Sequence, residues 1–466
     1  MNSMNYQYDV AVVGAGPAGI ASACSMSELG LRVLVLDEQA RPGGQIYRNI
    51  EKAPESRCKL LGSDYTKGAC LVNQLRSADL DYRSEAAVWQ VEPDGTVFFS
   101  HKGESHCVKV ERIVVATGAM ERPVPFSGWT LPGVMGAGAA NNLYKDSGLK
   151  PSGKVVIAGS GPLLLLEACQ LASSGVEISA ILETASAYPS LEALAQLPSA
   201  LRRADYLVKG VKMLWDIKRT GVPHLKNVKE VRAHGDDKLS KVTAMQNGKA
   251  VSFDADSLLV HFGVIPNTAM FSQLGCRHEW DNVQRYWYPV TDTWGRTSLE
   301  RVFAAGDGTF VHGAGAAELK GRLTALEVAH SVGKLSLSQR DEQAERIQKK
   351  LARELSPRPF IDAMFAPDID ACAFDDETLV CRCEHVTVVQ IKDAVRQGCT
   401  NPNDIKALVR SGMGPCQGRM CGNAIVELLS ILTSGKPSDA ERLRIRPPLK
   451  NVSMQEMASM RFEGGE

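Results

Sequence analysis

Four cysteines in the C-terminal part of the chain have the types and spacing of ligands for an iron–sulfur centre. Cys381 and Cys383 are separated by one residue, and Cys416 and Cys421 by four. Two short loops that each offer two thiolates suit a rhomboid [2Fe–2S] cluster, because each iron takes two cysteine sulfurs. Glycines at 412, 414, 418 and 422 leave backbone N–H groups free to bond sulfur. The pattern predicts a one-electron centre.

Other interpretations of these cysteines stay open. A zinc site with four cysteine ligands is one, although zinc ligands usually show a wider first spacing. Unligated thiols are another. His385 is placed to replace a cysteine as in a Rieske centre, but a solvated histidine is the plainer interpretation. Cys399 lies outside both pairs, so we expect it in the core.

A second group of residues suits the phosphates of a dinucleotide. Gly14, Gly16 and Gly19 directly follow the apolar run 10–13. Gly14 allows a tight turn, Gly16 lets the backbone approach a pyrophosphate, and Gly19 lets a helix pack closely on the strand. The helix N-terminus directs free N–H groups at the phosphates. Asp37 and Glu38 end the next strand, near the offset of about 20 residues at which an acidic side chain binds a ribose diol.

Residues 153–183 repeat this pattern with one departure. Gly159 and Gly161 follow a strand, a helix reaches Gly175, and the next strand ends at Glu183. Leu164 stands where the third glycine belongs, and a leucine there pushes the helix away from the strand. The sequence therefore favours an adenine-nucleotide site or an empty site over a working NAD(H) site.

Several further elements must position these groups. We expect antiparallel strands at 86–91 and 97–110 around the turn Asp94-Gly95, and a separate parallel strand at 112–119. A strand at 301–305 precedes Gly306-Asp307, and a helix follows at 316–332.

Among the cysteines, Thr387 and Gln390 form a capping box, Asp404 caps a helix at 405–410, and a third helix covers 423–432. Residues 336–375 have the composition of a charged, helical linker. We expect the tail after Pro437 to be a solvated extension, and the alternative for this tail is a docking segment.

The composition narrows the function classes. The 466 residues contain 53 Lys plus Arg and 53 Asp plus Glu, which argues against nucleic acid or an anionic membrane as the main partner. The most apolar segment, 154–172, is interrupted by Glu167 and by glycines, so no membrane span is expected. The first residues carry no export signal, and we expect a cytoplasmic protein.

Residues 8 to about 335 resemble the glutathione/thioredoxin-reductase-like flavoproteins. The segment Arg41–Tyr47, the strand ending in Ala116-Thr117-Gly118 and the closing Gly306-Asp307 carry the resemblance. It implies bound FAD, contacted by Gly14, Gly16, Pro17, Ala18, Gly19, Asp37, Glu38, Gly43, Gly44, Gln45, Val88, Ala116, Thr117, Gly118, Gly306 and Asp307. The dithiol of the disulfide reductases is missing. His261 and His312 lie near these motifs, but we expect packed histidines rather than catalysts.

The cysteine segment resembles the bacterioferritin-associated ferredoxin-like [2Fe–2S] domain. That resemblance makes Cys381, Cys383, Cys416 and Cys421 the metal ligands. The fold class expected for the whole chain is α/β, with two Rossmann-like dinucleotide-binding domains of the two-domain flavoprotein type and a small helical C-terminal [2Fe–2S] domain. The expected boundaries are 1–125 with 290–335 for FAD, 150–268 for the second domain, 336–375 for the linker, 376–435 for the cluster and 436–466 for the tail.

Taken end to end, the chain is similar to the larger (A or α) subunit of heteromeric amino-acid dehydrogenases, such as opine oxidases, hydrogen cyanide synthase and D-hydroxyproline dehydrogenase. The resemblance implies that a catalytic flavoprotein β subunit oxidises a CH–NH bond of an opine (octopine or nopaline), D-hydroxyproline or glycine, and that this subunit relays the electrons to an acceptor. It leaves room for FMN at a subunit interface and for a small third subunit. The alternative is a self-contained NAD(P)H:acceptor oxidoreductase, which needs residues 159–183 to bind nicotinamide.

Overall fold

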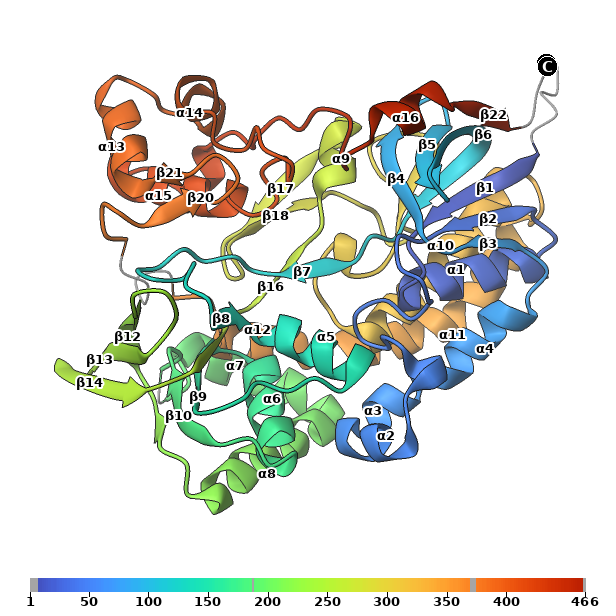
Figure 1. The fold of residues 1–466 in the computed structure, drawn as a ribbon. Coiled ribbons are helices and arrows are strands. Elements are labelled where there is room, and N and C mark those ends of the chain that lie inside the picture. The colour runs from blue at the N-terminus through green and yellow to red at the C-terminus, as the bar shows by residue number, and fades with distance from the viewer. Residues whose placement is uncertain (1–6, 187, 369–373, 464–466) are drawn as a thin grey trace.

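An eight-stranded sheet carries the first glycine motif near its centre. The computed structural model describes residues 7–186, 188–368 and 374–463 (Figure 1). In this sheet β1 (Tyr8–Val13) lies between β2 (Val33–Leu36) and β6 (Glu104–Val115), and both pairings are parallel. β1 and β2 are almost entirely buried, as expected for parallel strands covered on both faces.

The strand β6 differs from what the sequence predicts. The expected strand at 97–110 is broken by a turn at Lys102 and Gly103, both with positive φ, which leaves β5 (Thr96–His101) as the shorter piece. The rest joins the expected parallel strand into one continuous β6. Its first half pairs antiparallel with β5, and its second half pairs parallel with β1 and β19 (Val302–Ala304). The alternation of apolar and polar residues continues through this short turn, so the sequence pattern did not indicate that the strand is interrupted.

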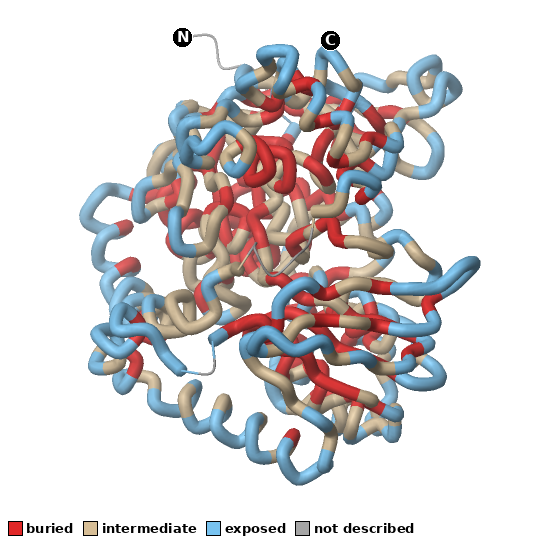
Figure 2. Tube along the Cα trace, turned by 90° about the vertical axis from the view of Figure 1, so that its left-hand side faces the viewer, coloured by how far each residue is buried: buried red, intermediate tan, exposed pale blue. Residues whose placement is uncertain are grey.

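Two helices pack on one face of this sheet. α1 (Pro17–Glu28) lies against α10 (Ala314–Ser331), and the approach is close enough that a Cβ at Gly321 would lie 2.3 Å from the Ala18 carbonyl oxygen. Their buried side chains form one core with β1 and β2. Figure 2 shows the buried residues concentrated inside the body and the exposed ones along its periphery.

The second glycine motif lies on a separate five-stranded sheet of order β11-β10-β9-β15-β8. β9 (Val155–Ser160) is central and pairs in parallel with β10 (Ile178–Glu183) and β15 (Ser257–Phe262). The helices α5 (Ala137–Ser147) and α6 (Pro162–Ser173) pack on it. A three-stranded sheet, β12 (Val228–His234), β13 (Lys241–Gln246) and β14 (Lys249–Asp254), lies beside it.

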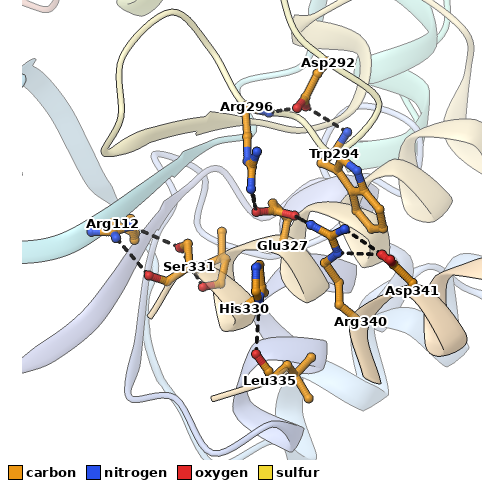
Figure 3. A network of polar contacts seen from close by, with 11 residues as sticks. Arg112, Asp292, Trp294, Arg296, Glu327, His330, Ser331, Leu335, Arg340 and Asp341 are labelled. Atoms are coloured by element: carbon orange, nitrogen blue, oxygen red, sulfur yellow. Dashed lines mark hydrogen bonds and ion pairs between the residues drawn. The ribbon is translucent and has the colours of Figure 1, made fainter. Parts of the chain in front are cut away.

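The charged helices after residue 336 are packed rather than linker-like. α11 (Leu337–Leu355) lies along α10, where Arg340 donates to the buried Glu327 carboxylate at 2.6 Å (Figure 3). Arg296 donates to the other oxygen at 2.9 Å, and the Arg340 guanidinium lies 4.0 Å from the centre of the Trp294 ring. Because the completely buried Glu327 carboxylate depends on both arginines to offset its loss of solvation, the bond from Arg340 fixes α11 against α10.

The cysteine segment forms a small domain around its own core. A hairpin of β20 (Leu379–Cys381) and β21 (Val386–Thr387) precedes α13 (Val388–Arg396), α14 (Pro402–Val409) and α15 (Gly422–Thr433). The capping box at Thr387 and Gln390 is confirmed. Asp404 does not cap α14, because the helix begins earlier, at Pro402, and Asn401 accepts the N-terminal N–H bonds.

The tail crosses back to the first sheet, so a solvated extension is the wrong interpretation. Leu449 is buried beside that sheet, and its N–H donates to the Trp89 carbonyl at 2.7 Å. β22 (Arg461–Glu463) then adds a parallel strand to β6. Glu463 accepts from Arg83 at 2.7 Å and lies 2.7 Å from His106. Alternating basic and apolar residues looked like surface chain, yet Leu443 and Leu449 are buried.

No helix in the described part of the chain is both long enough and apolar enough to cross a membrane.

Candidate flavin and iron–sulfur sites

A cavity of about 500 Å³ opens at the carboxyl ends of β1 and β2. All but three of the residues predicted to contact FAD line it. The three exceptions are glycines that pack just behind the wall. A Cβ on Gly43 would meet the Tyr47 backbone, one on Gly306 would meet Ala18, and one on Gly19 would meet Gly14. The sequence motifs therefore converge on one cavity.

The glycines of the first motif are required by close backbone contacts. Gly14 has φ +103°, and a Cβ on Gly19 would lie 1.8 Å from the Gly14 carbonyl oxygen. A Cβ on Gly44 would come within 2.9 Å of the Gly16 Cα. Two glycine segments thus face each other across a narrow gap that side chains would fill, and the cradle fits a pyrophosphate.

The two acidic residues after β2 do different things. Asp37 is buried, and its carboxylate accepts from the N–H groups of Ala15 at 2.5 Å and Gln39 at 2.7 Å. Burial raises its pKa. Glu38 is exposed at the cavity and pairs with Lys450 of the tail at 2.5 Å. Asp37 therefore holds the glycine loop in shape, whereas Glu38 offers the freer carboxylate to a ribose diol.

Asp307 shapes the opposite wall of the cavity. It lies in the short 3-10 helix Gly306–Gly308 and accepts from the N–H groups of His312 at 2.9 Å and Gly313 at 3.1 Å. These bonds hold the loop that leads into α10, whose N-cap Gly313 and first residue Ala314 line the cavity. The helix N-terminus and its positive dipole end therefore face the space. Burial lowers the pKa of His312 to about 2, so it is a neutral packed histidine.

The helix α5, which packs on the second sheet, closes the cavity with polar side chains that the sequence did not indicate. Asn141, Asn142 and Lys145 of α5 line it, and the Lys145 ammonium donates to the Gln45 carbonyl at 3.1 Å. Asn141 donates to Glu167 of α6 at 2.7 Å. Burial lowers the pKa of Lys145 to about 8 and raises that of Glu167 to about 7. Both groups thus titrate near neutral pH.

At the second glycine motif, protein side chains take the positions that a bound nucleotide would need. Leu164 is completely buried in the core between α6 and its sheet. Glu183, at the position of the ribose-binding acid, lies 2.8 Å from His224 and 3.8 Å from Lys226. His261 borders Gly161 and lies 2.7 Å from Glu121. The acid that a nicotinamide dinucleotide would need is already engaged with protein side chains.

The four predicted cluster cysteines come together as two pairs. The buried Cys421 thiol donates to the Cys381 sulfur, and this bond lowers the pKa of Cys381 to about 5 and raises that of Cys421. Cys383 and Cys416 form the second, more exposed pair, and burial raises the pKa of Cys383. Among the described residues, no three cysteine, histidine, aspartate or glutamate side chains are arranged to hold one ion. Two pairs of thiols match the two irons of a [2Fe–2S] cluster.

One residue connects the two predicted centres. Arg419 lies between Cys416 and Cys421 in the chain, yet its side chain lines the cavity beside β1. Its guanidinium donates to the Leu449 carbonyl at 2.8 Å, and Leu449 and Lys450 line the same cavity. α15 is also fixed to the flavoprotein body, where Arg285 donates to the buried Glu427 at 2.9 Å. The loop that carries Cys416 and Cys421 and the dinucleotide cavity are therefore neighbours.

The chain matches a family model described as pyridine nucleotide-disulphide oxidoreductase over residues 8–333. It belongs to this family. As a member, it is a flavin-dependent oxidoreductase that binds FAD, which confirms the fold class and this cofactor. Residues 379–430 match a BFD-like [2Fe–2S] binding domain, which confirms the iron–sulfur cluster.

Relatives share this architecture over nearly their whole length. The A subunit of opine oxidase from Rhizobium meliloti (strain 1021) is 38% identical over 97% of this chain and 99% of its own. The HcnB subunit of hydrogen cyanide synthase from Pseudomonas aeruginosa is 33% identical over 88% of this chain and 90% of its own. Both are subunits by name. L-proline dehydrogenase from P. horikoshii shares the fold, with a TM-score of 0.71 at 20% identity over 97% of this chain and 79% of that one.

Several lining residues carried no signal in the sequence. Arg48, Asn141, Lys145 and Met270 reach the cavity from elements whose placement depends on the tertiary fold. Arg419 is the exception, because an arginine between two cluster cysteines is a local feature that could have been singled out.

Proposed function

We propose that this chain is the electron-relaying subunit of a heteromeric dehydrogenase that oxidises a CH–NH bond of an amino acid or opine. The names of its relatives support a role within an assembly of several different chains. FAD accepts electrons in pairs, and a [2Fe–2S] cluster passes them one at a time. One chain that binds both is suited to accept a pair and release single electrons.

The placement of Arg419 carries this proposal. A residue of the cysteine-ligand loop that lines the dinucleotide cavity brings the cluster loop next to the flavin site. In the proposed assignment Cys381, Cys383, Cys416 and Cys421 ligate the irons. Gly14, Gly16 and Gly44 admit the pyrophosphate, Glu38 binds the ribose, and the N-terminus of α10 faces the flavin.

The proposal extends to the partners and to the location. A catalytic flavoprotein β subunit holds the substrate pocket, a small third subunit completes some assemblies, and the complex is cytoplasmic. FMN at a subunit interface and an adenine nucleotide in the second domain belong to the same proposal. The division into a discontinuous FAD domain, a second domain and a cluster domain also stays a prediction.

Coexpression with a candidate β subunit tests the proposal. We expect dye reduction with opines or imino acids by the complex, and almost none by the isolated chain. If the isolated chain oxidises these substrates at the full rate, its assignment as a relay subunit is wrong.

A variant separates the relay from substrate oxidation. Arg419→Gln should slow reduction of the cluster after photoreduction of the flavin, read by the visible bands of each centre. Arg396→Gln, an exposed arginine of α13 paired with Asp393, is the control and should leave that rate unchanged.

A further inference from the structure

The helix α8 presents an unusual outer face. It covers Ala204–Thr220, follows α7 (Leu191–Ala200) within the long connection from β10 to β11 (His224–Leu225), and lies at the lower edge of the molecule in Figure 1. Its inner face packs on α6 through the buried Ile217, and Cys169 of α6 donates to the Met213 carbonyl at 3.5 Å. The helix is therefore anchored, and its outer face is free to contact another molecule.

That outer face carries a second apolar stripe. Ala204, Val208, Val211 and Trp215 follow one another at spacings of four, three and four residues, which places them on one side of the helix. Val208 and Val211 are each 67% exposed, and Trp215 is 55% exposed. A surface helix normally buries its apolar stripe and directs polar residues outward. Here one face packs on α6 through the buried Ile217, and a separate apolar stripe faces water.

Cations without internal partners flank the stripe. Arg202, Lys212 and Lys218 are exposed and make no ion pair with any residue that the structure describes. The Arg219 guanidinium lies 4.4 Å from the centre of the Trp215 ring. The acidic residues of the helix are Asp205, which Arg203 binds at 2.8 Å, and the half-buried Asp216. The surface is therefore apolar along its centre and positive at its edges.

We propose that this face docks an amphipathic helix with acidic flanks on the catalytic subunit, an inference that rests on the proposed function. A stripe with spacings of four and three residues is the narrow seam of a two-helix contact. A second copy of this chain would bring the same cations against each other. A lipid surface calls for a broader apolar face than this seam. The charge and the spacing together favour a different polypeptide.

The experiment measures binding between this chain, with both cofactors loaded, and a candidate catalytic subunit from an adjacent reading frame. Val208→Glu combined with Val211→Glu should weaken the complex on the order of 100-fold, because central apolar contacts dominate interfaces. Lys212→Glu combined with Lys218→Glu should weaken it on the order of tenfold and remove its salt dependence. Leu408→Glu on α14, also exposed, is the matched control and should bind like the wild type. All variants should keep the flavin spectrum of the wild type.

Each other result overturns the inference. Unchanged binding by the double Val variant rejects this face and leaves the proposed function standing. A wild-type chain that binds no catalytic subunit rejects the proposed function as well. If the isolated wild-type chain dimerises and the Val variant does not, the occupant is a second copy. If the wild type sediments with anionic phosphatidylserine vesicles and the variant does not, the occupant is a membrane.

Discussion

The two glycine motifs of this chain have nearly the same sequence pattern and opposite outcomes. In the first, Gly19 brings α1 against the Gly14 carbonyl, and the motif opens on a cavity of about 500 Å³. In the second, Leu164 occupies the equivalent position and is completely buried in its own core. The acid of the first, Glu38, is exposed at the cavity, where it pairs with Lys450, whereas that of the second, Glu183, is buried and engaged with His224. One side chain at the third position distinguishes a cradle from a packed core.

The largest effect should come from transferring the leucine to the first motif. Gly19→Leu places a side chain where even a Cβ would lie 1.8 Å from a carbonyl oxygen, so α1 must move and the cradle is lost. We expect the purified protein to contain no bound flavin, measured by the absorbance ratio of flavin to protein. Gly210→Leu is the control, because a Cβ there would meet no atom within 4 Å beyond its chain neighbours and the adjacent backbone of its own helix. Retained flavin in Gly19→Leu would remove the basis of the comparison.

The reverse exchange should destabilise the protein without creating a nucleotide site. Leu164→Gly leaves a cavity in the core and places a glycine inside α6, which together should lower the free energy of unfolding by about 3–5 kcal/mol. Urea denaturation measures this loss, and the half-buried Leu166→Gly on the same helix should lose less. NADH added anaerobically should not bleach the flavin of either the wild type or the variant. Bleaching by the wild type would restore the NAD(P)H oxidoreductase alternative.

A pH-dependent difference should arise where the second motif's helix meets the cavity of the first. Burial raises the pKa of Glu167 to about 7, so the folded state binds this proton more tightly than the unfolded state. The contribution of Glu167 to the free energy of unfolding is therefore fully present below pH 4.5 and is lost as the pH rises to about 7.

Glu167→Gln should remove that loss. Above pH 7 the Glu167→Gln variant should have a higher thermal midpoint than the wild type. The difference should correspond to at most about 3 kcal/mol in the free energy of unfolding, and it should disappear as the pH falls to 4.5. The exposed Glu177→Gln is the control. A gap that does not change with pH would contradict the assignment.

The smallest effect should be a difference in FAD affinity between variants of Glu38 and Glu183, the acidic residues of the two motifs. Glu38→Gln should weaken FAD binding about tenfold, because a hydrogen bond to a charged group contributes about 1.5 kcal/mol. Glu183→Gln should leave FAD binding unchanged, because its carboxylate binds His224 instead. Titration of the flavin-free protein with FAD measures both constants. Equal weakening in the two variants would mean that the second motif supports the flavin.

Local patterns were readable from the sequence, and distant contacts were not. The glycines, the cysteine spacing and the capping box at Thr387 each depend on neighbours within a few residues. The structure confirms the capping box, gathers most of the predicted glycines at one cavity and brings the four cysteines together in two pairs. Lys145 and Lys450 reach the cavity only through the packing of separate elements, which no single-sequence pattern encodes. The burial of Arg340 against Glu327 is similar, because a charged helix reads as solvated until its ion-pair partner is known.

The return of the tail to the first sheet has a consequence for biogenesis. β22 is made after the cysteine loops, and it pairs with the strand that also borders β1. The flavin-binding sheet therefore gains its edge strand only once the segment that receives the irons has been synthesised. The sheet beside the flavin cavity is therefore complete only when the chain beyond the cysteine segment has also folded onto it.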